Sequence, residues 1–461
     1  MIEPHGQRRS LFTLPALAVA EQACRAALAL AIAPLRLLGY AVHRRRYVAE
    51  LSEDLATQAS PPEPPPLPPL PQRPLRIFLS CAEPSGELHA RSLLQNLRAQ
   101  IAAAGAPPPI VFGLGGPALG DLGVERVGDP VARAAMGFGV VAALPFYLGL
   151  LTCAARALRE RDPDLVIGVD SPALHVPLCA IARRYGLRTV HFVTPQYWGW
   201  APWRVGGYRR AVGLALSILP FEPAWFERHG VRAKHVGHPL LDALADVPAT
   251  LPPDASRTLV ILPGSRRSVL ARNLPWMVEV LAEWRLRHPD ARIVLPHARR
   301  ELVPAIEAIL ARCGASEWVH VATEPLHAVL AGARAAFSVS GTVLLDLLHH
   351  RLPTVVVYRV SNGLESFGAR HLLTVPHFAA PNLLAGEAVC PEFCFHGEGP
   401  RPAVLDALTG LWADGDARAT CRAGLERAAA RLGPPGASRR AARWALAELA
   451  RAPAGGPDAT G

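Results

Sequence analysis

The chain has 461 residues, of which 50% are hydrophobic and 19% charged, so it holds ample apolar material for packed cores. This composition excludes full-length disorder, which requires low hydrophobicity and a high net charge, and the sequence has no Gly-X-Y repeat of the collagen type. The formal net charge is +10, and every cation except Lys234 is an arginine. No nucleic-acid-binding motif accompanies that charge, so we expect no nucleic acid partner. A basic surface of this kind suits anionic substrates or lipid headgroups.

Residues 1–74 differ in composition from the rest and are predicted to form an apolar tail and a proline-rich linker. Residues 11–41 are strongly apolar, but charged residues and prolines interrupt them. Neither uncharged run reaches the ~18 residues of a membrane-spanning helix, so we predict a segment lying along a membrane surface. Residues 8–12 carry two arginines and precede an apolar run up to Ala20; an export signal of the twin-arginine type therefore stays open. The prolines of 61–71 predict an extended spacer.

From residue 75 onward, short apolar strands alternate with helical patterns. The predicted strands are 76–80, 109–114, 164–169 and 189–193, and then 258–262, 291–295, 335–339 and 354–358. This alternation predicts βαβ units and parallel sheets. We therefore predict an α/β protein with two doubly wound, Rossmann-like domains facing a cleft, at 75–245 and 246–435, and a C-terminal helix and tail at 436–461. Ligands of such sheets bind at the carboxyl ends of the strands.

Two turns of the second predicted domain carry groups that suit a phosphate. The turn after 258–262 combines a glycine, a serine and an arginine, and the turn after 335–339 places small hydroxyl residues at a helix N-terminus. Backbone N–H groups, hydroxyls and a guanidinium can all meet an anion there. An ordinary loop or a simple helix cap is the alternative for each turn. The residues concerned are Gly264, Ser265, Arg266, Ser340, Gly341 and Thr342.

Two carboxylates of the first predicted domain stand at strand ends. Glu83 lies in the turn after 76–80, and Asp170 directly follows 164–169. Either could serve as a general base, and an ordinary turn or helix N-terminal carboxylate is the alternative for both. His191 lies inside a predicted strand, where a hydrogen-bonded core histidine is expected. Neither a Walker loop nor a GxGxxG motif occurs, so no nicotinamide cofactor is predicted.

Two further segments are unusually apolar for connections. The stretch 136–151 contains Met136, Phe138 and Phe146, and the loop 195–204 contains several aromatic residues, Trp198 among them. Solvent would not favour such side chains, so they pack on the core or contact a membrane or acyl chains.

Taken together, these turns resemble lipid-A-disaccharide synthases, a family of GT-B glycosyltransferases. The resemblance runs in order from about Arg76 to about Arg431. Its motifs are AEPSGE at 82–87, GLGGP at 113–117, MG at 136–137, GVDSP at 168–172, VTPQYWGW at 193–200, WR at 203–204, LPFE at 219–222, VGHP at 236–239, LPGSR at 262–266, SGT at 340–342, YR at 358–359 and PNLLAG at 381–386.

The resemblance implies that a UDP-linked 2,3-diacylglucosamine condenses with 2,3-diacylglucosamine 1-phosphate, with inversion and without a cofactor or an obligatory metal. It implies that Asp170 or Glu83 lies near the acceptor. The residues implied around UDP and lining the cleft are Ser265, Arg266, Ser340, Gly341, Thr342, Asp346, Tyr358, Arg359 and Asn382. Met136, Phe138, Phe146 and Trp198 are the expected membrane or acyl contacts. The resemblance also implies a peripheral protein on the cytosolic face of the inner membrane of a Gram-negative-type bacterium, and it leaves a homodimer open.

The chain departs from the family pattern at several positions. An Ala stands at 82 where the pattern has Gly, and Ala173 and His175 replace an Asp and an Asn. Val269 replaces a Glu, and Asp346 is a shorter carboxylate than the usual Glu. Two other functions therefore stay open. The first is another GT-B enzyme of UDP-sugars, either an epimerase or a glycosyltransferase for a different lipid, and the second is a catalytically weakened, membrane-attached binding protein.

Overall fold

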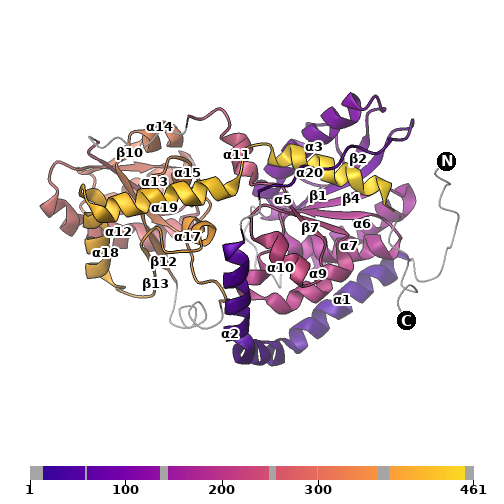
Figure 1. The fold of residues 1–461 in the computed structure, drawn as a ribbon, viewed down its shortest axis with the longest axis horizontal. Helices are drawn as coiled ribbons and strands as arrows, with labels where there is room; N and C mark the ends of the chain where they lie inside the picture. The colour runs from indigo at the N-terminus through magenta and orange to yellow at the C-terminus, as the bar shows by residue number, and fades with distance from the viewer. Residues whose placement is uncertain are drawn as a thin grey trace. The chain divides into compact units, whose positions relative to one another are not determined.

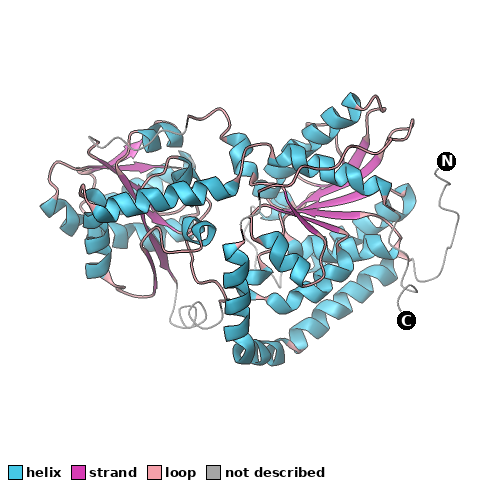
Figure 2. Cartoon of the chain, viewed as in Figure 1, coloured by secondary structure: helices cyan, strands magenta, loops and turns pink. Residues whose placement is uncertain are grey.

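The computed structural model describes residues 14–57, 60–134, 144–248, 256–297, 300–360 and 373–451. The chain forms two compact units. Unit 1 comprises Met1–His43, Ala59–Asp242 and Pro434–Gly461, and unit 2 comprises Arg44–Gln58 and Ala243–Gly433. Each unit contains one sheet with helices packed on it (Figure 1, Figure 2).

The sheet of unit 1 has seven strands in the order β3-β2-β1-β4-β5-β6-β7, and every pair of neighbours is parallel. The strands are β1 (Arg76–Cys81), β2 (Ile110–Leu114), β3 (Glu125–Gly128), β4 (Leu165–Val169), β5 (Thr189–Phe192), β6 (Leu214–Ser217) and β7 (Ala233–His235). The helices are α1 (Pro15–Ala31), α3 (Pro84–Ala103), α4 (Pro117–Gly120), α5 (Val131–Ala134), α6 (Leu144–Arg161), α7 (Pro172–Arg184), α8 (Tyr197–Trp200), η2 (Pro202–Arg204), α9 (Val205–Ala211), α10 (Glu222–Arg228), α11 (Pro239–Ala243), α20 (Ala437–Ala447) and η4 (Glu448–Ala450).

Both faces of the sheet are buried at its central strands, which explains why β1 and β4 read as continuous apolar runs. Alternate residues of β1 serve different cores, because successive side chains of a strand point to opposite faces. Ile77 and Leu79 belong to the core beneath α3 and α20, whereas Phe78 belongs to the core formed with α6, α7 and α1. Ala18 and Val19 are the α1 residues buried in that second core.

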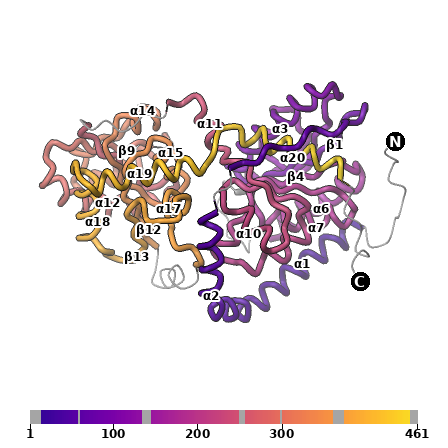
Figure 3. Tube along the Cα trace, viewed as in Figure 1, coloured from indigo at the N-terminus to yellow at the C-terminus, as the bar shows by residue number. Residues whose placement is uncertain are grey.

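The C-terminal helix α20 returns to unit 1 and packs along α3, as the yellow trace in Figure 3 shows. The carboxylate of Asp242 accepts hydrogen bonds of 2.6 and 2.8 Å from the amides of Gly436 and Ala437, and one of 2.8 Å from Ser438, at the start of this helix. A carboxylate at a helix N-terminus satisfies amides that lack partners within the helix. The Arg440 guanidinium also donates to the carbonyl oxygen of Val236 at 2.8 Å.

From Pro15 onward the N-terminal region is helical. After α1 follows α2 (Ala33–Ala56), which belongs to unit 1 up to His43 and to unit 2 beyond it. No single helix within the described ranges is long and apolar enough to cross a membrane. Taken together, α1 and α2, which are bent by 56°, have the length and apolar composition of a span. Residues 60–71 form neither helix nor strand, and Leu67 and Leu70 pack against the unit 1 core.

The sheet of unit 2 has six parallel strands in the order β10-β9-β8-β11-β12-β13. They are β8 (Thr258–Leu262), β9 (Arg292–Pro296), β10 (Val319–Ala322), β11 (Ala335–Val339), β12 (Thr354–Arg359) and β13 (Glu392–Phe395). The helices are α12 (Arg267–Arg287), η3 (Arg300–Leu302), α13 (Val303–Arg312), α14 (Leu326–Ala331), α15 (Val343–His349), α17 (Ala380–Ala385), α18 (Arg401–Trp412) and α19 (Asp416–Leu432).

Candidate functional site

The strand order of each sheet identifies where a ligand should bind. In unit 1 the order reverses between β1 and β4, and in unit 2 it reverses between β8 and β11. Such topological switch points open a crevice at the carboxyl ends of the strands, where doubly wound sheets bind their ligands. Glu83 and Asp170 follow the two strands at the first switch point. The turns at 264–266 and 340–342 follow the two strands at the second.

The two carboxylates of unit 1 lie in adjacent turns. Cys81 pairs with Val169 across the β1–β4 ladder, so both turns leave the sheet at the same edge. In the first turn of α3, a Cβ atom at Gly86 would lie 3.6 Å from Cβ of Asp170. Glu83 is exposed and Asp170 is half-buried. The fold therefore places the two residues that the sequence offered as a general base in neighbouring turns at the carboxyl ends of β1 and β4.

The backbone at Asp170 is held in an unusual conformation. Asp170 and Ser171 have φ angles of +58° and +42°, and Val193 after the neighbouring strand has +65°. Left-handed backbone at a non-glycine residue costs roughly 1–3 kcal/mol and persists only where the surroundings enforce it. The carbonyl oxygen of Asp170 lies 2.6 Å from Nδ1 of His175 and 2.8 Å from Nε2 of His191. The Asp170 amide donates to the Phe192 carbonyl at 2.8 Å.

Both imidazoles are buried and neutral at neutral pH. Burial, together with the neighbouring His191 ring, lowers the pKa of His175 to about 3. Burial likewise lowers the pKa of His191. His191 is the hydrogen-bonded core histidine that its strand position predicted. Its contact with Asp170 was not predictable. The alternation of residues along a strand does not show which turn after a neighbouring strand a side chain reaches.

Two more histidines lie near this site, and sequence reasoning missed both. His89 on α3 has a pKa that burial lowers and that the nearby Asp170 and Asp242 carboxylates raise only in part. His238 follows β7, and burial, together with the His89 ring, lowers its pKa to about 4. The VGHP motif was the available signal for His238. Both rings are therefore neutral, and of the two His89 lies within electrostatic range of the Asp170 carboxylate.

Trp198 requires a correction. It was expected at a membrane or acyl chain, but its side chain is buried and packs edge-on against Phe221 at 4.9 Å. Its indole N–H donates to Glu222 at 3.1 Å. The Glu222 carboxylate also accepts from the amides of Ile218 and Leu219, and burial raises its pKa to about 7. Trp198 thus packs inside unit 1, because its indole N–H finds a buried acceptor there.

The other expected membrane contacts have different outcomes. Phe146 lies on α6, half-buried against the core that includes α1 and α7. Met136 and Phe138 lie outside the described residues. In the aromatic loop the exposed ring is Trp200, and the Arg204 guanidinium stacks over it at 4.8 Å.

In unit 2 the first phosphate-suited turn leads into α12. Gly264 has a φ of +113°, and a Cβ atom there would lie 2.5 Å from Cγ1 of Val269, so no other residue fits without rearrangement. Ser265 and Arg266 are exposed, and Arg266 occupies the N-cap position of α12 in an extended conformation. The amides that open a helix have no partners within it, so the hydroxyl, the guanidinium and these amides form a donor set for an anion.

The second turn of unit 2 packs against the segment before α17. The Ser340 hydroxyl donates to the Phe378 carbonyl at 3.1 Å. The ring of Tyr358, at the end of β12, stacks on Phe378 with a centroid distance of 5.9 Å. Gly341 and Thr342 are exposed, and a Cβ atom at Gly341 would meet open space.

Two further residues expected around UDP, Arg359 and Asp346, lie at the end of β12 and on α15. Arg359 donates from Nη1 to the Arg272 carbonyl on α12 at 2.8 Å. Asp346 lies on α15, with an oxygen 3.5 Å from Nε2 of His327. Burial raises the pKa of Asp346 to about 6 and lowers that of His327. Because burial moves both groups toward their neutral forms, this contact is a weak ion pair.

The expected position of Asn382 also requires a correction. It was expected to line the cleft, but its side chain is fully buried. The amide oxygen accepts from the backbone N–H groups of Val389 and Cys390 at 2.9 and 2.7 Å, and the amide nitrogen donates to the Cys390 carbonyl at 2.8 Å. All of these partners are protein backbone, so Asn382 fixes the segment after α17.

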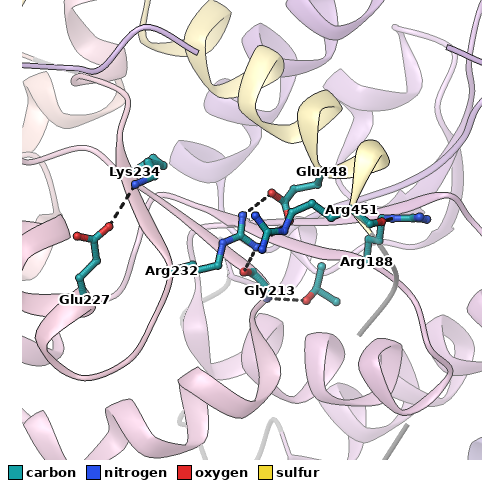
Figure 4. Close-up of polar contacts among 8 residues, drawn as sticks. Arg188, Gly213, Glu227, Arg232, Lys234, Glu448 and Arg451 are labelled. Carbon is teal, nitrogen blue, oxygen red and sulfur yellow. Dashed lines mark hydrogen bonds and ion pairs between the residues drawn. The ribbon is translucent and has the colours of Figure 1, made fainter. Parts of the chain in front are cut away.

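A cavity of about 260 Å³ lies at the amino ends of β5 and β6, on the side of the unit 1 sheet opposite to the carboxyl ends of its strands. Figure 4 shows its polar contacts. Arg232 pairs with Glu448 through contacts of 2.6 and 3.1 Å and donates to the Gly213 carbonyl. Arg188 donates to the Arg451 carbonyl at 2.9 Å. These bonds attach the C-terminal segment to unit 1, and the cavity is remote from the switch point.

Two parallel sheets with candidate residues at both switch points define the class as the GT-B fold of glycosyltransferases and UDP-sugar epimerases. Two solved structures resemble this chain at a TM-score of 0.50 and 12% sequence identity. One is a Staphylococcus aureus MnaA–UDP co-structure, over 79% of this chain and 94% of that one. The other is a UDP-GlcNAc 2-epimerase from Neisseria meningitidis bound to UDP-GlcNAc, over 79% and 97%. At this identity the likeness concerns the fold alone.

The sequence comparisons are more specific. Residues 77–412 match the family model described as lipid-A-disaccharide synthetase. A lipid-A-disaccharide synthase from Azotobacter vinelandii is 35% identical, over 82% of this chain and 98% of that protein. The corresponding protein from Geobacter sulfurreducens is 33% identical over the same shares. The chain belongs to the lipid-A-disaccharide synthase family, and it is a hexosyltransferase of lipid A biosynthesis.

Proposed function

We propose that this protein transfers 2,3-diacylglucosamine from UDP to 2,3-diacylglucosamine 1-phosphate, with inversion at the anomeric carbon. The observation that carries the proposal is the chemistry of the two switch points in a member of this family. Carboxylates stand at the first, and an exposed hydroxyl, guanidinium and helix amides stand at the second. The products are the β-1,6-linked disaccharide 1-phosphate and UDP.

The proposed step requires one base and one anion site. The acceptor hydroxyl oxygen bonds to the anomeric carbon while the bond from that carbon to the diphosphate oxygen breaks. Asp170 takes the hydroxyl proton, and Arg266 and Ser265 bind the diphosphate as its charge develops. Glu83, in the adjacent turn, is the other carboxylate available. We favour Asp170 as the base because two buried imidazoles fix its backbone, whereas Glu83 is exposed.

The remaining phosphate-side residues have supporting roles in this proposal. Gly341 and Thr342 bind the diphosphate, and Ser340 fixes their turn through Phe378. The Asp346 carboxylate holds the ribose hydroxyls. Tyr358 and Arg359 line the same edge of the unit 2 sheet, at the end of β12.

The decisive experiment supplies the purified chain with UDP-2,3-diacylglucosamine and 2,3-diacylglucosamine 1-phosphate, and detects products by mass spectrometry. We expect a tetra-acylated disaccharide 1-phosphate and UDP in equal amounts. Proton NMR of the product should show a β-linkage. An α-linkage would contradict inversion, and UDP-sugar epimerised without disaccharide would make the chain an epimerase. Binding of both substrates without any product would identify a weakened binding protein.

We further infer that the protein attaches to a membrane surface through α1 and α2, because its proposed substrates carry acyl chains. Large apolar side chains are exposed along this region, with Leu30 at 77%, Leu35 at 71% and Val42 at 71%. Arginines at 44–46 follow on α2, and each cation near an anionic surface contributes about 1 kcal/mol. Apolar burial and charge attraction together favour a bilayer with anionic lipids.

This attachment is tested by sedimentation with phosphatidylglycerol-containing vesicles. The double variant Leu30→Glu/Leu35→Glu should lose most of the bound fraction, because each carboxylate would have to enter the apolar layer. Leu286→Glu is the matched control, since Leu286 on α12 is 78% exposed and lies in the other unit. Equal sedimentation of the double variant and the control would exclude α1 and α2 as the attachment.

A further inference from the structure

The carbonyl oxygen of Asp170 is the centre of a buried hydrogen-bond network. It accepts from His175 at 2.6 Å and from His191 at 2.8 Å. The second nitrogen of His175 lies 2.9 Å from the Ser80 hydroxyl, and that of His191 lies 2.9 Å from the Tyr208 hydroxyl. All four side chains are buried.

This network determines the tautomer of each ring. A carbonyl oxygen only accepts, so both imidazoles must donate to it. His175 therefore carries its proton on Nδ1 and accepts from Ser80 through Nε2. His191 carries its proton on Nε2 and accepts from Tyr208 through Nδ1. The two rings are thus in opposite tautomers, and each is fully hydrogen-bonded while neutral.

The partners come from both sides of β4. Ser80 belongs to β1 and His191 to β5, the two strands that flank β4, and Tyr208 belongs to α9. His175 lies on α7 and packs over β4, where a Cβ atom at Gly168 would lie 2.9 Å from its Cβ and Cγ. Glycine at 168 therefore leaves room for this ring.

We propose that His175 and His191 are positioning residues that hold the Asp170 backbone in its left-handed conformation and so direct its carboxylate. That the two rings hold the Asp170 backbone rests on geometry alone. That they direct a catalytic carboxylate rests on the proposed role of Asp170 as the base. His175 replaces an asparagine of the family pattern, so this chain reaches Ser80 with a ring where the pattern has a shorter amide.

The first test measures the ring tautomers by ¹⁵N NMR of the full chain labelled at histidine. We expect His175 protonated on Nδ1 and His191 on Nε2, with both rings neutral at pH 7. This readout does not depend on activity. The same tautomer in both rings, or a protonated ring, would overturn the proposed network.

The second test uses variants that remove or keep the donor. His175→Leu and His191→Leu remove it, whereas His175→Asn and His191→Gln place an amide nitrogen near the former Nδ1 and Nε2 positions. A displacement of about 1 Å at a reacting group can cost about 100-fold in rate, so we expect kcat of the Leu variants to fall by roughly 10- to 100-fold. KM for the UDP-sugar should stay unchanged, and the amide variants should recover most of kcat.

The double variant His175→Leu/His191→Leu shows whether both rings act on the same atom. Its loss should be smaller than the product of the single losses, since coupled residues are not additive. His229→Leu is the matched control, because the His229 ring also lies 2.8 Å from a backbone carbonyl in unit 1, that of Trp225. We expect its kcat to equal that of the parent.

Two outcomes separate this inference from the proposed function. If both Leu variants keep full kcat, or keep Asp170 left-handed in their crystal structures, the positioning role is wrong. If Asp170→Asn keeps full activity while the tautomers are as expected, the network stands and the base is a different residue. Should a Leu variant fail to fold, the parent NMR spectrum and the amide variants still decide the question.

Discussion

The two switch points of this protein share one sheet topology but differ in backbone strain and in burial. At the unit 1 site the backbone is strained at Asp170 and Ser171, and buried imidazoles hold it in place. At the unit 2 site Ser265, Arg266 and Thr342 are exposed at helix N-termini. In the proposed reaction the Asp170 carboxylate takes a proton and must be fixed in direction, which suits its half-buried surroundings. The diphosphate proposed to bind in unit 2 has many acceptor oxygens, which suits exposed donors.

The largest expected effect concerns the unit 1 switch point, at Asp170. Asp170→Asn should reduce the rate of disaccharide formation by roughly 10²- to 10⁴-fold, because an amide cannot accept the hydroxyl proton. Asp162→Asn is a matched control, since Asp162 also has a positive φ, +43°, but precedes β4 rather than following it. A larger loss in Glu83→Gln than in Asp170→Asn would move the base to the neighbouring turn.

Substitutions at the exposed unit 2 switch point should change the affinity for UDP. Arg266→Ala removes a charged donor, and hydrogen bonds to charged groups contribute about 1.5–3 kcal/mol, so the Kd for UDP should rise by roughly 10- to 150-fold. Calorimetry with UDP alone measures this. Arg267→Ala, one residue further along and also exposed, is the control. If both variants bind UDP alike, the guanidinium of Arg266 does not contact the diphosphate.

A pH titration distinguishes the buried network from the exposed turns. Because burial lowers the pKa of His175 from 6.5 to about 3, the unfolded chain binds more protons than the folded chain between these values. The stability from this group is therefore present above pH 6.5 and is lost as the pH falls toward 3. His175→Asn should reduce the slope of unfolding free energy against pH by about 1.4 kcal/mol per pH unit. An unchanged slope in denaturant titrations at pH 4.5 and 5.5 would show that His175 is not a buried neutral ring.

The smallest expected effect concerns Asp346. Restoring the glutamate of the family pattern, Asp346→Glu, should lengthen the reach of this carboxylate toward the ribose. One added hydrogen bond contributes about 1 kcal/mol, so UDP affinity should rise by about 5-fold. Uridine measured in parallel should show the same gain, because the diphosphate is not involved. A loss of affinity for UDP but not for uridine would place Asp346 near the phosphates instead, because two like charges would then approach one another.

The fold itself was predictable from local patterns. Alternation of apolar strands with helices predicted two parallel α/β sheets, and this prediction is confirmed. The predicted strand ends also placed Glu83 and Asp170 after β1 and β4, where the structure has them. The family membership that the motifs implied is likewise shown by the comparisons.

The inward orientation of Trp198 and Asn382 was not predictable. An aromatic loop and a motif asparagine have the same sequence whether they face a ligand or the core. The difference depends on distant acceptors and donors, Glu222 for Trp198 and the backbone of 389–390 for Asn382. The return of α20 to unit 1 depends in the same way on Asp242, almost two hundred residues earlier in the chain.

By itself, therefore, the sequence determined what recurs at short range: the elements, their alternation and the positions of polar turns at strand ends. Only the tertiary structure decided that His175 and His191 reach the same carbonyl oxygen. Those residues come from α7 and β5, and their meeting depends on the register between β4 and β5, in which Gly168 pairs with His191. Register across a parallel sheet depends on packing on both of its faces, and that packing involves helices distant in the chain from the strands that pair.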